Sequence, residues 1–78
     1  MLTITNENRA MRGRNTLEFY IEHQAQGEVD LSNQDAVQSE VACLLADLMH
    51  LCDEEKADFN RALQLAHDHH TEEVEEEK

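Results

Sequence analysis

Apolar residues recur every three or four positions over three stretches of the chain, and this spacing predicts three α-helices. The first stretch covers residues 6–24, and either Thr5 or Asn6 can cap its start. Gly13 lies on the apolar face, where it marks either the close approach of another helix or weak packing. Residues 25–31 then read as a loop. The inner face of this helix carries Ala10, Gly13, Leu17, Tyr20 and Ile21.

The second stretch, residues 32–54, has the most continuous apolar seam in the chain. Its N-cap is Ser32 or Asn33, and Ser32 in that role would place Asp35 where a capping box has its acid. Leu45 and Cys52 widen the seam on one flank. The seam itself consists of Val37, Val41, Leu44, Leu48 and Leu51.

The third stretch, residues 58–71, follows a short polar break and begins at Asp58, a suitable N-cap. Because the connection is short, residues 32–54 and 58–71 are expected to form an antiparallel αα-hairpin. Residues 72–78 hold five acids and one apolar residue, so we expect a disordered acidic tail. The inward positions of the third helix are Phe59, Ala62, Leu63 and Ala66, with His70 continuing the line.

The fold class expected is therefore all-α, a three-helix module in which residues 1–71 form a single domain. A chain of 78 residues buries a small share of its surface, and its stability as a monomer is marginal. Burying a further apolar face between two chains would relieve this, so we expect a homodimer through the second helix. The expected interface residues are Val37, Val41, Leu44, Leu45, Leu48 and Leu51.

The net charge of −12 is confined to one part of the chain. Residues 1–27 are neutral, since Arg9, Arg12 and Arg14 offset three glutamates, and residues 28–78 carry fifteen acids against three bases. Such a surface repels phosphate backbones and attracts basic surfaces, which argues against direct nucleic-acid binding. A protein partner is the expectation. A compact acidic body could also imitate the phosphates of DNA and occupy a basic groove on another protein.

Several features exclude other classes. The longest apolar run, Val41–Ala46, is far too short to cross a membrane, and the N-terminus lacks the layout of a signal peptide, so a cytoplasmic location is expected. Cys43 and Cys52 are nine residues apart on one helix and point to opposite sides, so they cannot pair with each other. Gly-rich loops and nucleophile motifs are absent from the sequence, which therefore predicts no cofactor.

Two groups of side chains are candidates for metal binding. His67 and His70 share a helix face, and Glu73 follows one turn later. A catalytic zinc site needs three protein ligands and a structural one four, so the alternative is a polar helix end with no metal. The second group, Glu40, Asp47 and Glu54, repeats every seven residues beside the apolar seam. These carboxylates could hold Mg²⁺ or simply border a helix–helix interface.

Residues 40–63 resemble the closing helix pair of the MazG-type all-α nucleotide pyrophosphohydrolases. The resemblance is carried by Leu-Ala-Asp at residues 45–47 within a long apolar helix, a polar turn, and a second helix starting at residues 58–63 with Asp-Phe-Asn-Arg-Ala-Leu. It implies an oligomerising helical scaffold. The chain also looks like the short helical proteins of phages and mobile elements.

Members of that family bind Mg²⁺ through an upstream ExxE pair and a downstream ExxD pair. Asp47 matches the final aspartate, but Leu44 stands three residues before it. Upstream, Glu18 and Glu22 are four residues apart, and no ExxE occurs before residue 30. The resemblance thus carries over to Asp47 alone, which cannot form a metal site.

The expected function is protein–protein interaction, as an accessory or regulatory protein of a phage or mobile element, without enzymatic activity. Two alternatives stay open: a nucleic-acid-mimicking inhibitor, and a minimal MazG-like Mg²⁺-dependent hydrolase. Mimicry predicts a complex that weakens steeply with salt. The enzyme predicts Mg²⁺-dependent pyrophosphate release that Asp47→Ala abolishes.

Overall fold

The computed structural model describes residues 4–24 and 29–78. It contains three helices in chain order, which confirms the all-α class: α1 (Asn6–His23), α2 (Gln34–Glu55) and α3 (Phe59–Glu76). Of the expected loop 25–31, residues 25–28 lie outside the described part of the chain. None of the described helices is long and apolar enough to cross a membrane.

The residue directly before each helix is its N-cap. The side chain of this residue accepts a hydrogen bond from a main-chain N–H in the first turn of the helix. Thr5 caps α1 at 3.1 Å, Asn33 caps α2 at 2.8 Å, and Asp58 caps α3 at 3.0 Å. These bonds satisfy amides that have no partner within the helix, and a short polar side chain just before the first turn is suited to this role. Local sequence predicted the Asp58 cap outright and narrowed the other two to Thr5 or Asn6 and Ser32 or Asn33, of which the structure has Thr5 and Asn33.

The capping box built on Ser32 is wrong, because the N-cap of α2 is Asn33 and the helix begins at Gln34. Ser32 instead donates two hydrogen bonds to Asp30 Oδ1, from its main-chain N at 2.9 Å and from its Oγ at 2.6 Å. These two bonds, the hydroxyl bond more than the main-chain bond, lower the pKa of Asp30 below its ordinary value. The loop into α2 thus closes on a side chain–backbone turn.

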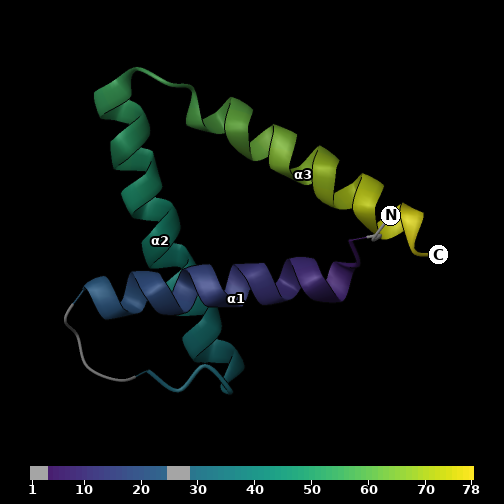
Figure 1. The fold of residues 1–78 in the computed structure, drawn as a ribbon. Helices are drawn as coiled ribbons and strands as arrows, with labels where there is room; N and C mark the ends of the chain where they lie inside the picture. Colours follow the sequence, from purple (N-terminus) through teal and green to yellow (C-terminus); the bar gives the residue numbers. More distant parts are fainter. Residues whose placement is uncertain (1–3, 25–28) are drawn as a thin grey trace.

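A Schellman motif ends α2 and sets the direction in which α3 leaves. The Ala57 N–H donates to the Cys52 carbonyl at 2.9 Å, and the Lys56 N–H donates to the Asp53 carbonyl at 3.4 Å. Lys56 adopts the left-handed conformation with φ of 59°. The chain turns sharply there, and α2 and α3 contact each other near the turn and then diverge (Figure 1).

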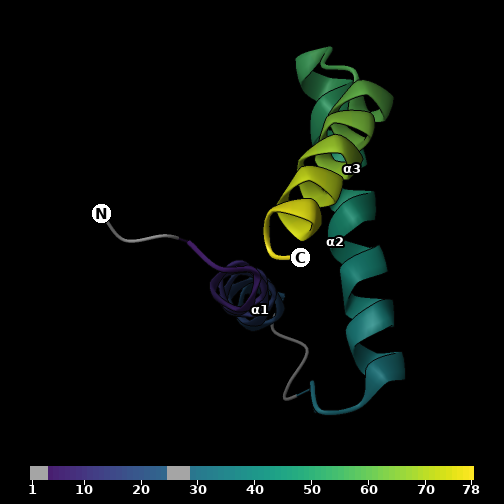
Figure 2. The same ribbon diagram turned by 90° about the vertical axis from the view of Figure 1, so that its right-hand side faces the viewer.

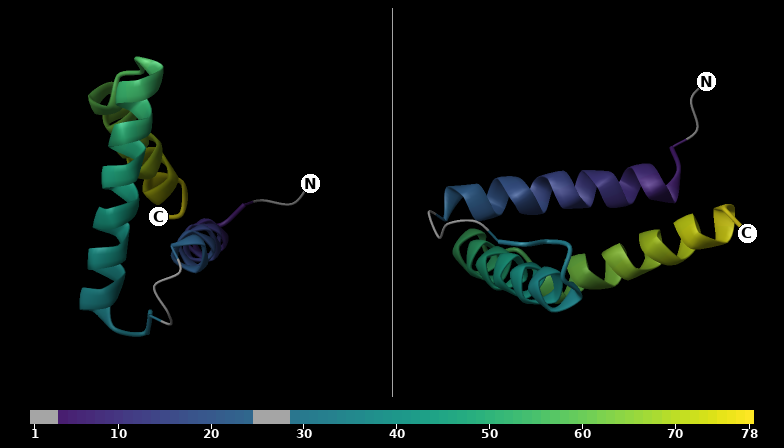
Figure 3. Two further views of the ribbon diagram at one scale, coloured as in Figure 1. Left: turned by 90° about the vertical axis from the view of Figure 1, so that its left-hand side faces the viewer. Right: turned by 90° about the horizontal axis from the view of Figure 1, so that it is seen from below.

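The helices lie in two layers. α1 crosses α2 on one side of the pair formed by α2 and α3, as the end-on views of α1 show (Figures 2 and 3). The C-terminal end of α3 returns to the start of α1, so the three helices outline an open triangular frame (Figure 1). The frame is closed by the α2–α3 turn, by the α1–α2 crossing and by polar contacts between α1 and α3.

The chain buries little of its own surface. Among the described residues only Leu17 and Ile21 of α1 are buried, and α2 and α3 bury none. The Cα radius of gyration is 14.4 Å, whereas a compact domain of this length has about 11.5 Å. The accessible surface is 6769 Å², against about 4,900 Å² for a compact monomer of 9.0 kDa. The apolar seam of the second helix therefore does not form a core within one chain.

The structure extends the third helix into residues 72–78, the segment expected to form a disordered acidic tail. α3 continues to Glu76, five residues beyond the expected end at residue 71. The tail was expected to fray because it has little apolar surface to bury. Its acids instead make polar contacts with Asn6 and Arg9 of α1, and these hold the last turns in place.

Candidate functional site

Much of the apolar seam of α2 is exposed. Val41, Leu45, Leu48 and Leu51 are between 37 and 52% exposed, although their spacing places them on or beside one helix face. In a soluble monomer, large apolar side chains at helical spacing ordinarily face a core. The structure therefore presents an apolar surface of the kind that another protein covers.

The first half of this seam lies beside α1. Val37, Val41 and Leu44 line a hollow of about 730 Å³ together with Leu17 of α1 and Leu31 of the preceding loop. The remaining members of the expected interface, Leu45, Leu48 and Leu51, lie outside that hollow. The structure thus divides the interface set that the sequence predicted as one surface.

Gly13 also lines the hollow, and its role is now clear. A Cβ added there would meet no atom within 4 Å, so the glycine does not mark a close approach of helices within the chain. Of the two interpretations offered by the sequence, weak packing is the one that the structure supports. At this point α1 contributes the small residues Gly13 and Ala10 to the lining of the hollow.

One hydrogen bond marks the crossing of α1 over α2. The Tyr20 hydroxyl donates to Asp47 Oδ2 at 2.5 Å. This bond, followed by desolvation and by the charges of Asp47, Cys43 and Glu40, raises the pKa of Tyr20 to about 12. Among the described residues, the Glu40 Oε2 atom is shielded from solvent without a hydrogen-bond partner. The sequence had placed Tyr20 on an inner face and Asp47 beside the seam, but it could not show that they meet.

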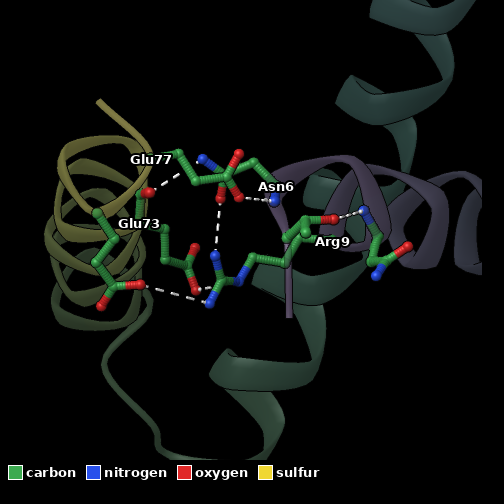
Figure 4. Close-up of polar contacts among 7 residues, drawn as sticks. Asn6, Arg9, Glu73 and Glu77 are labelled. Atoms are coloured by element: carbon green, nitrogen blue, oxygen red, sulfur yellow. Dashed lines mark hydrogen bonds and ion pairs between the residues drawn. The ribbon is translucent and has the colours of Figure 1, made fainter. Parts of the chain in front are cut away.

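Polar contacts join the start of α1 to the end of α3 (Figure 4). Arg9 Nε lies 3.0 Å from Glu73 Oε2, and a second guanidinium nitrogen lies 3.8 Å from Glu76 Oε2. Asn6 donates from its Nδ2 to the Glu73 carbonyl at 3.0 Å and from its main-chain N to Glu77. We call this set of contacts the α1–α3 clasp. Sequence reasoning missed it, because the arginines were read only as a patch offset by nearby glutamates.

The candidate metal ligands are not gathered into a site. In residues 4–24 and 29–78, no group of three or more His, Cys, Asp or Glu side chains is arranged to hold a metal ion. Glu73, expected beside His67 and His70, pairs instead with Arg9. Glu40, Asp47 and Glu54 do not converge either, and Asp47 is bonded to Tyr20.

Cys43 is exposed and Cys52 half-buried, and both thiols are free.

Comparisons with known proteins give this chain no relatives. No protein-family model matches it, and neither the curated proteins nor the solved structures contain a significant match. The residues and surfaces described above are therefore the only basis for a function.

Proposed function

We propose that this chain is a small acidic protein–protein interaction module that forms a homodimer through the exposed part of the α2 seam. The observation that carries the proposal is the exposure of Leu45, Leu48 and Leu51 on a helix with no buried residue. Covering these side chains with protein would remove apolar area from water, which is the main driving force of association.

The size of the exposed surface fits this proposal. The chain exposes about 1,900 Å² more than a compact monomer of its mass, and a stable interface buries about 800 Å² on each partner. One interface of standard size therefore accounts for about two fifths of the excess. A second copy is the partner that is always present, and it carries the same apolar face.

The test is sedimentation equilibrium of the full chain and two matched variants. Leu48→Asp places a charge on the seam, whereas Ser39→Asp adds the same charge to the opposite face of α2. We expect wild type and Ser39→Asp to sediment as dimers and Leu48→Asp as a helical monomer of 9.0 kDa. A wild-type monomer at about 1 mM, where even weak pairs with a Kd of that order associate, would refute the proposal.

A second candidate function, nucleic-acid mimicry, gains support from one observation. The acids of residues 72–76 lie on a helix, so their spacing is regular. Glu75 and Glu76 have side chains that are 62 and 66% exposed although Glu75 pairs with Lys78 and Glu76 with Arg9, and Glu73 is engaged by Arg9. These acids could face a basic groove on a nucleic-acid-binding protein.

Mimicry has its own test. Any protein partner recovered from the host is titrated against wild type and Glu72→Gln/Glu75→Gln at rising salt. Mimicry predicts that the variant binds less tightly and that wild-type affinity falls steeply with salt. A complex insensitive to both changes would eliminate this function.

A further inference from the structure

The hollow between α1 and the first half of α2 has a second property besides its apolar floor. Arg9, Arg12 and Arg14 all line it, so three of the six lysines and arginines of the chain gather at one place. The floor beneath them is formed by Leu17, Val37, Val41 and Leu44. We call this surface the arginine-bordered groove.

Two of the three arginines that line the groove form no ion pair within the described residues, and Glu7 is the one acid among the described residues that line it. Arg9 is held by Glu73 and Glu76 in the α1–α3 clasp. Arg12 and Arg14 form no ion pair with any described carboxylate, although the chain carries 18 acids. An apolar floor with two uncommitted guanidinium groups at its edge is complementary to a partner that presents apolar side chains beside carboxylates.

The shape of the groove favours a helix over a small molecule. A small-molecule pocket buries most of its ligand, whereas Met11 and Val41 along this groove are 57 and 39% exposed. On the α1 side, Ala10 and Gly13 present little or no side chain between the larger Met11, Arg12 and Arg14, and a Cβ added to Gly13 would meet no atom within 4 Å. A helix backbone can approach closely over such small residues, since the distance between packed helices depends on the side chains at the contact.

We propose that the arginine-bordered groove binds an amphipathic α-helix of a partner protein, with carboxylates flanking its apolar stripe. The stripe would cover Val37, Val41 and Leu44, and the carboxylates would pair with Arg12 and Arg14. The groove uses Val37, Val41 and Leu44, whereas the proposed dimer surface uses Leu45, Leu48 and Leu51, so the two interactions rest on different side chains of α2. The interaction thus goes beyond homodimerisation and names the chemistry of a second partner.

The experiment measures fluorescence anisotropy with two labelled synthetic peptides. Both are helices of about five turns with the same leucine stripe, flanked by glutamates in one and by lysines in the other. The full chain is titrated at about 0.15 M salt, where fields reach only about 8 Å, so that charges at the groove count more than the overall −12. We expect the glutamate peptide to bind more tightly than the lysine peptide.

Three variants of the full chain locate the binding. Arg12→Gln/Arg14→Gln should weaken binding of the glutamate peptide by about tenfold or more. Gly13→Phe should abolish it by filling the groove, with helicity retained because the added Cβ meets nothing within 4 Å. Arg61→Gln, which removes a cation of α3 outside the groove, should leave the affinity unchanged.

Clear outcomes would overturn the proposal. One is a lysine peptide that binds as tightly as the glutamate peptide, and another is no binding at up to about 1 mM. A glutamate-peptide affinity that Gly13→Phe and the arginine substitutions leave unchanged would also do so. If Gly13→Phe dissociates the chain's own dimer, the occupant is a second copy and not a foreign helix. Failure of Leu48→Asp to dissociate the dimer would instead refute the homodimer alone.

Discussion

The contact between Tyr20 and Asp47 allows a direct solution test of how α1 crosses α2. Tyr20 is the only tyrosine in the chain, and the chain has no tryptophan, so near-ultraviolet absorbance of the phenolate reports this one residue. Its ordinary pKa of 10.0 is raised to about 12, first of all by the hydrogen bond to Asp47. A spectroscopic titration of the folded protein should therefore show its inflection well above pH 10.

Two substitutions at Asp47 separate the causes of this shift. Asp47→Ala removes both the acceptor and the negative charge, so the pKa of Tyr20 should return close to 10.0. Asp47→Asn keeps an acceptor and removes only the charge. The pKa of Tyr20 in this variant should therefore lie between its values in the wild type and in Asp47→Ala. Asp53→Asn is the matched control, because it removes an acid from the same helix without touching Tyr20.

The same shift couples stability to pH, and the sign follows from the protons bound in each state. Between about pH 10 and 12 the unfolded chain loses the tyrosine proton while the folded chain retains it. The stabilising contribution of Tyr20 is thus fully present below pH 10 and is lost as pH rises through 12. Far-ultraviolet circular dichroism recorded with the absorbance separates ionisation from unfolding. An inflection at pH 10 with helicity unchanged would refute the Tyr20–Asp47 contact.

Three further substitutions test other parts of the frame. Gly13→Ala should raise the free energy of unfolding by about 0.5–1 kcal/mol, because a helical glycine is replaced and its Cβ meets nothing; a lower melting temperature would contradict this. Asp58→Ala should lower the free energy of unfolding by about 1 kcal/mol through loss of the α3 cap, measured by urea denaturation. An unchanged midpoint would mean that the cap bond contributes nothing to stability. Arg9→Gln should lower the free energy of unfolding by at most about 1 kcal/mol. This difference in stability from wild type should shrink in about 1 M salt. A difference that persists at high salt would show that Arg9 acts through packing.

Local features of the chain were readable before any tertiary contact was known. The helices at residues 6–24, 32–54 and 58–71 agree with α1, α2 and α3 apart from their ends, because helical periodicity and N-caps depend on residues close in sequence. Asp58 as the N-cap of α3 is an example, whereas for α1 the pattern left Thr5 and Asn6 open and the structure has Thr5. Where two caps were equally good, as with Ser32 and Asn33, the pattern alone could not choose.

The extent of α3 could not be read locally. Residues 72–76 have one apolar side chain, so burial gives no reason for order there. The helix persists to Glu76 in the structure, where Glu73 and Glu76 reach Arg9, more than sixty positions earlier in the chain. A pairing over that distance in sequence follows from the direction in which α3 leaves the Lys56 turn, and no local pattern encodes that direction.

The sequence by itself thus determined the number, order and approximate span of the helices, together with the apolar seam of α2. Only the tertiary structure decided what meets that seam. α1 crosses its first half, forming the arginine-bordered groove, and leaves Leu48 and Leu51 exposed. The physical reason is that periodicity defines which face of a helix is apolar, whereas the crossing of helices depends on side chains that are distant in the chain.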